Sequence, residues 1–266
     1  MDRSLIKAQL PNLLTGHVPS NVRAFKYRIY DDQPNISALG FALDPEPFDG
    51  KVVATTSDAL IIKIARTQFA VVDRQLASQV PMIGSTVHVT PYARRRFDGL
   101  RADTPEESTR HTAHGQPYVV TSVILGTPQT KLPLPTPQCP ELQDLIQQIE
   151  QLPAPDRFRR IVHLLVDANA CDFELVDPTP KDILRTPPEL SFAVNTAKFQ
   201  GRVAVVYDRG LDVYAVELRC NGECVDRHDE VYFDALGDVL ERLIDDGQWR
   251  RIHVDILNGS TTRVTH

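Results

Sequence analysis

Alternating apolar and polar side chains predict β-structure through most of the first half of the chain. Short β-rich runs cover residues 23–30, 36–43, 51–56, 59–65, 68–72, 86–90 and 118–125, with turn-like residues between them. Asp73 is suited to cap a brief helix over residues 74–80. Residues 1–22 form an N-terminal arm whose amphipathic stretch is broken by Pro11. Five or six of these runs as short strands, together with one small helix, predict a small, partly open β-barrel of the OB or SH3-like type over residues 23–126.

Prolines dominate the segment that follows this β-rich region. Five of them lie between residues 126 and 140: Pro128, Pro133, Pro135, Pro137 and Pro140. Proline at this density favours an extended, semi-rigid spacer over a helix or a central strand. We therefore place a linker at residues 127–140.

Helical spacing of apolar residues begins after this linker. Two stripes, at Leu142, Leu145, Ile146, Ile149 and Leu152 and then at Phe158, Ile161, Val162, Leu165 and Ala168, predict a helical hairpin. Strands over 202–207, 211–220 and 223–227 form an antiparallel meander, in which Asn221-Gly222 is a strong hairpin signal. A helix starting after Asp234 and a last strand over 250–257 complete an α+β domain at residues 141–262. The predicted fold class is α+β overall.

Composition narrows the class of protein. The chain has 266 residues, of which 42% are hydrophobic and 24% charged, which is ordinary for a globular protein. Its apolar runs are too short for a transmembrane helix, and the first residues lack the pattern of a signal peptide. Four cysteines are too few for a disulfide scaffold. We expect a cytoplasmic protein with no membrane partner.

The net charge of −6 is unevenly distributed. Residues 1–135 carry 15 Lys and Arg against 12 Asp and Glu, a balance of +3, whereas residues 136–266 carry 14 against 23, a balance of −9. A polyanion would be repelled by the second half. Any nucleic-acid contact is therefore expected in the first half.

The most distinctive stretch for function runs from Thr90 to Arg101. Three consecutive arginines stand between two aromatic residues, and a fourth arginine follows. Guanidinium groups bind phosphate in a forked geometry, and aromatic rings stack unpaired bases. The candidate nucleic-acid-binding residues are Tyr92, Arg94, Arg95, Arg96, Phe97 and Arg101. The alternative is a solvated loop in which Asp98, Asp103, Glu106 and Glu107 neutralise the arginines.

Other motifs predict no catalysis, metal or cofactor. The segment His111-Thr112-Ala113-His114 lacks further ligands at a recognised spacing, and nucleotide-binding glycine motifs are absent. Cys220, Cys224 and His228 resemble a zinc signature. The Asn221-Gly222 turn, however, pairs Cys220 with Glu223, so that the two cysteines point to opposite faces of the hairpin. We expect neither a metal nor a cofactor.

Residues 91–105, Pro-Tyr-Ala-Arg-Arg-Arg-Phe-Asp-Gly-Leu-Arg-Ala-Asp-Thr-Pro, carry a resemblance to a known family. Together with the strands before them, over about residues 48–126, they resemble the KfrB-type accessory proteins of bacterial conjugative plasmids and integrating elements. The resemblance implies a cytoplasmic accessory factor of a mobile element that works near DNA. It implies no catalytic residues.

These observations predict a non-enzymatic binding protein that contacts single-stranded nucleic acid through the arginine and aromatic loop. The acidic second domain would bind a protein partner or form a homodimer, through the edge of its meander. One alternative is a protein-interaction adaptor or inhibitor that acts through that acidic domain. The other is an enzyme, which would need a deep pocket lined by converging polar groups.

Overall fold

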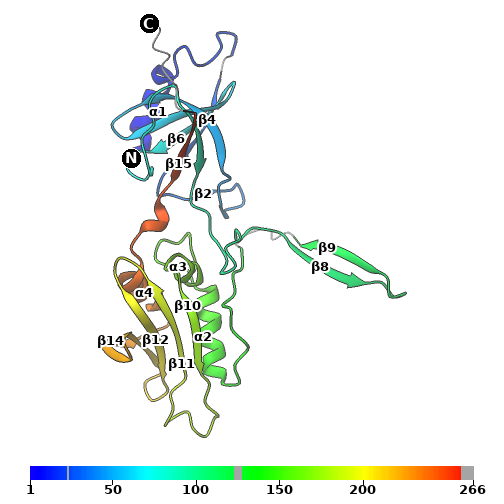
Figure 1. Cartoon of the computed structure of the whole chain (residues 1–266), viewed down its shortest axis with the longest axis vertical. Coiled ribbons are helices and arrows are strands. Elements are labelled where there is room, and N and C mark those ends of the chain that lie inside the picture. Colours follow the sequence, from blue (N-terminus) through cyan, green and yellow to red (C-terminus); the bar gives the residue numbers. More distant parts are fainter. Residues whose placement is uncertain (23, 123–127, 259–266) are drawn as a thin grey trace. The chain divides into compact units, whose positions relative to one another are not determined.

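The computed structural model describes residues 1–22, 24–122 and 128–258 and shows a mixed α+β protein that is rich in strands (Figure 1). The chain divides into two compact units. Unit 1 comprises Met1–Ala93 together with Trp249–His266, and unit 2 comprises Arg94–Gln248. The α+β class predicted from the sequence is confirmed. No helix in the described parts of the chain has the length and apolar character needed to cross a bilayer.

Unit 1 is built on one helix and an open sheet. Its elements are α1 (Arg3–Leu13), β1 (Lys26–Tyr30), β2 (Asn35–Ile36), β3 (Ala42–Leu43), β4 (Phe48–Thr55), β5 (Ala59–Ala65), β6 (Gln68–Asp73), β7 (Thr86–Thr90) and β15 (His253–Asn258). The main sheet has the order β1-β6-β5-β4-β7-β15. Among the described strands of this sheet, only β1 and β6 pair in parallel, and β2 and β3 pair with each other as a separate ribbon.

Both faces of this sheet are buried, which explains its uninterrupted apolar runs. In β5, Ala59, Leu60, Ile61 and Ile62 have no exposed surface. Ile61 packs on one face with the residues of α1, whereas Leu60 and Ile62 pack on the other face with strands β7 and β15. The amphipathic N-terminal segment is thus a helix that covers the sheet, and the Asp2 side chain caps it by accepting hydrogen bonds from the backbone N–H groups of Ser4 and Leu5.

Unit 1 differs from the predicted barrel in two ways. The sheet is not closed, because β1 and β15 stand at opposite ends of its strand order. Residues 74–80 form no helix: residues 74–76 make a turn, after which Ala77 makes a parallel bridge to Ile252. The backbone N–H of Ile252 donates to the carbonyl of Leu76, so this short segment covers the outer edge at the start of β15. Residues 123–125 of the predicted strand 118–125 lie outside the described residues.

Unit 2 places helices on one face of a five-stranded sheet. Its elements are β8 (Glu106–His111), β9 (Pro117–Ser122), α2 (Pro140–Gln151), α3 (Ile161–Asp167), β10 (Cys171–Val176), β11 (Glu189–Asn195), β12 (Gln200–Asp208), β13 (Val213–Cys220), β14 (Glu223–Val231) and α4 (Leu236–Ile244), with the 3-10 turn η1 (Gln248–Arg250) at the junction to unit 1. The sheet runs in the order β10-β11-β12-β13-β14, with every pair antiparallel. Side chains of α2, α3 and α4 share one apolar cluster with β11, β12 and β13.

The Asn221-Gly222 turn has the backbone that the sequence predicts. Both residues have positive φ, 51° and 84°, which suits a two-residue hairpin. Cys220 pairs with Glu223 and Arg219 with Cys224, and this register confirms the predicted pairing.

The chain is divided differently from the domains expected at residues 23–126 and 141–262. The expected linker belongs to unit 2, where Leu132 and Cys139 are part of the apolar cluster. The expected last strand of the second domain is β15, which pairs with β7 of unit 1. Strands β10 and β11 were not predicted from the sequence; they stand on either side of a segment that contains Pro178, Pro180, Pro187 and Pro188.

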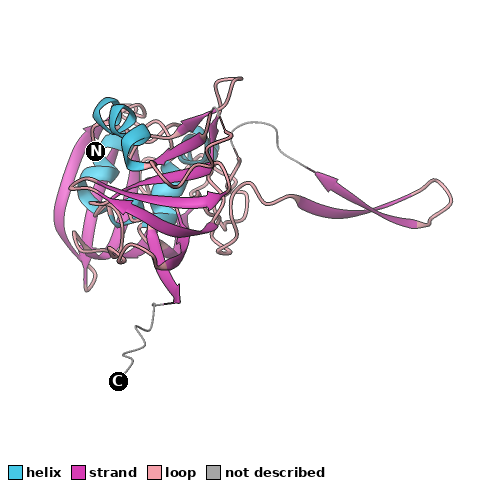
Figure 2. Ribbon diagram, turned by 90° about the horizontal axis from the view of Figure 1, so that it is seen from above, coloured by secondary structure: helices cyan, strands magenta, loops and turns pink. Residues whose placement is uncertain are grey.

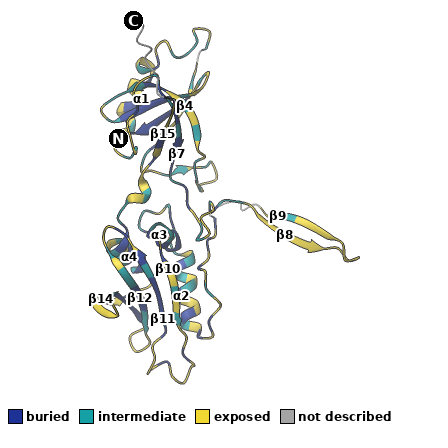
Figure 3. Ribbon diagram, viewed as in Figure 1, coloured by how far each residue is buried: buried dark blue, intermediate teal, exposed yellow. Residues whose placement is uncertain are grey.

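Residues 106–111, for which the sequence predicted no strand, form the first strand of a separate hairpin. Strands β8 and β9 pair only with each other, and nearly every residue in them is exposed (Figures 2 and 3). A two-stranded hairpin that buries so little is at best marginally stable alone in water.

Candidate functional site

Arg94 lies inside unit 2 and not on its surface. Only 1% of the residue is exposed, and its guanidinium carbon lies 4.7 Å from the centre of the Phe158 ring. Its Nη1 also donates to the Phe158 carbonyl at 3.3 Å. A buried cation stacked on a ring fixes the loop to the segment between α2 and α3. Arg94 therefore has a structural role in this geometry.

Two further arginines of the predicted site make short intramolecular hydrogen bonds. The Nη1 of Arg95 donates to the Gly99 carbonyl at 2.9 Å. Arg101 donates two hydrogen bonds to Asp103, from Nε at 2.9 Å and from Nη2 at 2.7 Å. The hydrogen bond from Arg101 is the main reason that the pKa of Asp103 lies below its usual value. Phosphate would have to compete with these partners.

The two aromatic residues of the predicted site, Tyr92 and Phe97, each pack against another aromatic ring. The Tyr92 ring lies 4.7 Å from the Trp249 ring, centre to centre and edge-on, within unit 1. The Phe97 ring lies 5.2 Å from Phe173, also edge-on, and packs against the core of unit 2. Edge-to-face pairs of this kind stabilise the fold. Tyr92 belongs to unit 1, whereas the other five predicted residues belong to unit 2.

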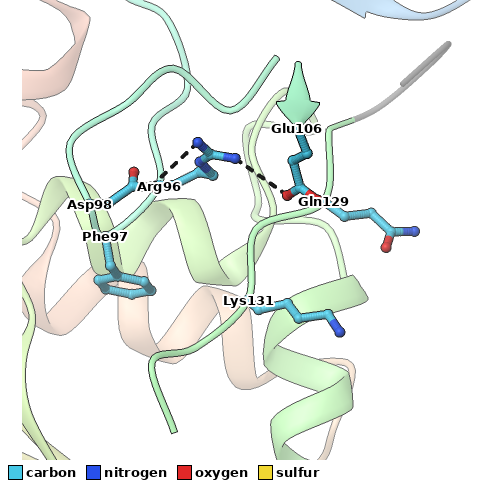
Figure 4. A pocket seen from close by; sticks show the side chains of 6 residues that line it. All are labelled: Arg96, Phe97, Asp98, Glu106, Gln129 and Lys131. Atoms are coloured by element: carbon cyan, nitrogen blue, oxygen red, sulfur yellow. Dashed lines mark hydrogen bonds and ion pairs between the residues drawn. The ribbon is translucent and has the colours of Figure 1, made fainter. Parts of the chain in front are cut away.

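Arg96 and Phe97 are the two predicted residues that share a pocket (Figure 4). The pocket has a volume of about 590 Å³, and its lining residues are Arg96, Phe97, Asp98, Glu106, Gln129 and Lys131. The guanidinium of Arg96 faces two carboxylates, with Nη2 3.4 Å from Asp98 and Nη1 3.4 Å from Glu106. The lining thus holds two cations and two carboxylates.

Sequence reasoning missed two of the pocket's polar groups, those of Gln129 and Lys131. Both lie after the hairpin, more than 30 residues from Arg96, in the segment interpreted as a linker. No motif marks them, because their position beside Arg96 results from the way the chain passes back over unit 2. Glu106, which sequence reasoning did identify as a neutralising residue, is the first residue of β8.

A second feature of unit 2 is the acidic strand at one end of its sheet. β14 pairs with β13 alone among the described strands, and all its residues before Val231 are exposed except the half-buried His228. Its carboxylates are those of Glu223, Asp226, Asp229 and Glu230. Arg227 is held by Glu217 and Asp229, and these bonds raise its pKa.

Exposed apolar side chains accompany these carboxylates. Val225 lies within β14, and Tyr232 and Phe233 follow it directly, with 60% and 55% of their surfaces exposed. Unit 2 as a whole carries 17 Lys and Arg against 26 Asp and Glu, a balance of −9. We call residues 223–234 the acidic edge.

Comparisons of the chain with protein-family models, curated proteins and solved structures gave no match. Among the described residues, no group of three or more His, Cys, Asp or Glu side chains is arranged to hold a metal ion.

Proposed function

We propose that this chain is a non-enzymatic accessory protein that binds an extended, basic segment of a protein partner along the acidic edge. The observation that carries this proposal is β14 itself: nine residues long, paired on one side, lined by carboxylates and followed by exposed Tyr232 and Phe233. An exposed sheet edge offers unpaired backbone N–H and C=O groups to an added strand.

Charge on an edge strand commonly protects it from pairing with other chains. A purely protective edge gains nothing from large apolar groups, yet Val225, Tyr232 and Phe233 are all exposed here. A partner with alternating Lys or Arg and apolar residues would match both features. Its cations would face the carboxylates while its apolar side chains cover the rings.

The nucleic-acid prediction from the arginine loop receives less support from the geometry. Arg94 is buried, Arg95 and Arg101 bind neighbouring groups, and the Arg96 guanidinium faces two carboxylates. Unit 2, which holds all four arginines, has a net charge of −9. A basic protein segment meets an attractive field at this unit, whereas a nucleic acid meets a repulsive one.

The resemblance to KfrB-type proteins adds a context to the proposal. It would place the partner among the bacterial proteins that handle the DNA of a plasmid or integrating element, since such proteins commonly carry basic segments. In this role the chain would cover a basic surface of the partner, as an adaptor or an inhibitor.

Fluorescence anisotropy with a labelled peptide of alternating lysine and valine tests this function. We expect binding that weakens as salt rises from 50 to 300 mM, because exposed charges are screened. The variant Asp226→Asn/Glu230→Gln should bind several-fold more weakly. The control Glu107→Gln/Asp144→Asn, which removes two exposed carboxylates from other surfaces of unit 2, should bind like the parent protein.

Two results would refute the proposal. One is absence of peptide binding at low salt. The other is equal loss in the two double variants, which would assign the attraction to net charge and not to the edge.

A labelled 20-nucleotide single strand serves in a parallel titration. Salt-dependent binding of that strand without peptide binding would favour the nucleic-acid prediction instead.

A further inference from the structure

We propose that the pocket at the base of the β8–β9 hairpin binds a small anionic molecule that combines one oxyanion group, carboxylate or phosphate, with an aromatic ring. The site is separate from the acidic edge, so this proposal does not depend on the proposed function. Its centre is the guanidinium of Arg96 (Figure 4).

The guanidinium of Arg96 lies farther from its carboxylate partners than do those of several other arginines in this chain. Each of five arginines has a carboxylate oxygen at 2.5–2.7 Å: Arg3, Arg101, Arg159, Arg202 and Arg219. Both carboxylates that face Arg96 are 3.4 Å away, beyond the usual length of a charge-assisted hydrogen bond.

The Nε of Arg96 adds a second, independent sign of an incomplete site. It is buried and finds no hydrogen-bond partner among the residues that the structure describes. Buried donors of this kind are rare in folded proteins, because each costs about 1–3 kcal/mol when left unsatisfied. An oxyanion that engages the guanidinium in a forked geometry would supply the missing acceptor after a small rotation of the side chain.

The remaining lining suits the rest of such a molecule. Lys131 and Gln129 also line the pocket; both are exposed and extend away from Arg96 in Figure 4, so they donate to a bound molecule only after turning toward it. The ring of Phe97 provides an apolar wall. A volume of about 590 Å³ lies in the range of pockets that hold small molecules. A compound with one anionic group and one ring uses both the cations and the wall.

The two carboxylates limit how much negative charge the pocket accepts. The side chains of Asp98 and Glu106 are 54% and 66% exposed. Glu106 can therefore turn into water at little cost when one oxyanion replaces it, whereas Asp98 also accepts a hydrogen bond from the backbone N–H of Leu100 at 3.0 Å. A chain of phosphates would still lie beside these two negative groups and be repelled. The lining therefore favours a compound with a single oxyanion over a nucleic acid.

Isothermal titration with four probes tests the site: benzoate, phenyl phosphate, inorganic phosphate and neutral benzamide. We expect one of the first two to bind at least about tenfold more tightly than inorganic phosphate, because the ring adds apolar contact. Benzamide, which lacks the charge, should not bind. The preference between benzoate and phenyl phosphate identifies the class of oxyanion.

Matched variants test whether the probes bind in this pocket. Arg96→Gln should weaken it by about tenfold or more, and Lys131→Gln should weaken it by a smaller factor. Arg95→Gln changes an adjacent arginine that does not line the pocket and should leave affinity within about twofold. Thermal unfolding of each variant checks folding, and Lys131→Gln keeps the test valid if Arg96→Gln is unstable.

Failure of all four probes to bind at millimolar concentration would overturn this inference. Equal affinity of Arg96→Gln and the parent protein would also overturn it. Neither result bears on the acidic edge, whose peptide titration tests the proposed function separately.

Discussion

Arg159 should be the most sensitive single charge in unit 2. Its side chain is fully buried, and three of its nitrogens each donate to a different carboxylate: Nε to Asp156 at 2.8 Å, Nη1 to Asp167 at 2.8 Å and Nη2 to Asp245 at 2.5 Å. These carboxylates come from the turn before α3, from the last turn of α3 and from the end of α4. One cation therefore connects three parts of the unit.

Replacing Arg159 by methionine keeps much of the volume and leaves three carboxylates, whose side chains are 6–10% exposed, without their cation. Breaking one buried pair costs about 3–5 kcal/mol. Because three carboxylates share this cation, we expect the upper part of that range at pH 7, about 4–5 kcal/mol. That is a large part of the roughly 5–15 kcal/mol by which domains are stable.

The loss of stability caused by Arg159→Met should depend on pH. Burial by itself would raise the pKa of Asp156, but the charge of Arg159 and three hydrogen bonds hold that pKa below its usual value. The contribution of Asp156 to stability is thus complete above its unfolded pKa of about 3.9 and is lost as the pH falls through the folded value. Without the Arg159 side chain, its charge and its hydrogen bond no longer lower this pKa, so burial raises the folded pKa above that of the parent protein. The deficit of Arg159→Met should therefore be largest at pH 7 and shrink toward pH 4.

Hydrogen exchange followed by mass spectrometry, in increasing urea, measures this deficit in peptides from β12 and β13. These strands report the opening of unit 2 separately from unit 1. Arg157→Met, an exposed change two residues away, is the control and should stay within about 0.5 kcal/mol of the parent. A deficit below about 1 kcal/mol, or one that does not vary with pH, would refute this account of the network.

Two further predictions follow from buried groups. His163 has no exposed surface and accepts a hydrogen bond at Nδ1 from the backbone N–H of Arg160. Burial, and after it the positive charges of Arg94, Arg160 and Arg159, lower the pKa of His163 to about 3. Its NMR ring signals should not titrate between pH 5 and 8. Unit 2 should lose stability as the pH falls from about 6.5 toward 3, because only the unfolded state takes up the proton; a midpoint near 6.5 for His163 would contradict this. Ile252, which directly precedes β15, is part of the core of unit 1, so Ile252→Ala should destabilise this unit by about 2–5 kcal/mol in urea unfolding. The control Ile256→Ala, at an exposed position of β15, should cost far less. Equal effects of the two substitutions would show that Ile252 is not part of the core.

The amino-acid sequence alone determined the local features of this protein. Apolar spacing predicted α2 and α4, because one face of each helix must be buried. Asn221-Gly222 predicted both the turn and the register beside it, since few other residue pairs adopt positive φ twice in succession. The imbalance of charge between the halves also follows from the sequence, and it recurs in the two units as +3 and −9.

Long-range pairing was decided only by the tertiary structure. Nothing in the residues around Ile252 says that this strand joins β7, more than 160 positions earlier, because an alternating strand pairs with whichever edge buries its apolar face. For the same reason the prolines around Leu132 and Cys139 indicated an extended chain without showing that it packs into unit 2. The arginine loop shows both kinds of contact. Its composition suits phosphate binding, and Asp103 and Glu106 are close enough in sequence to be expected as partners of its arginines. The burial of Arg94 against Phe158, 64 positions later, was decided only when the chain folded.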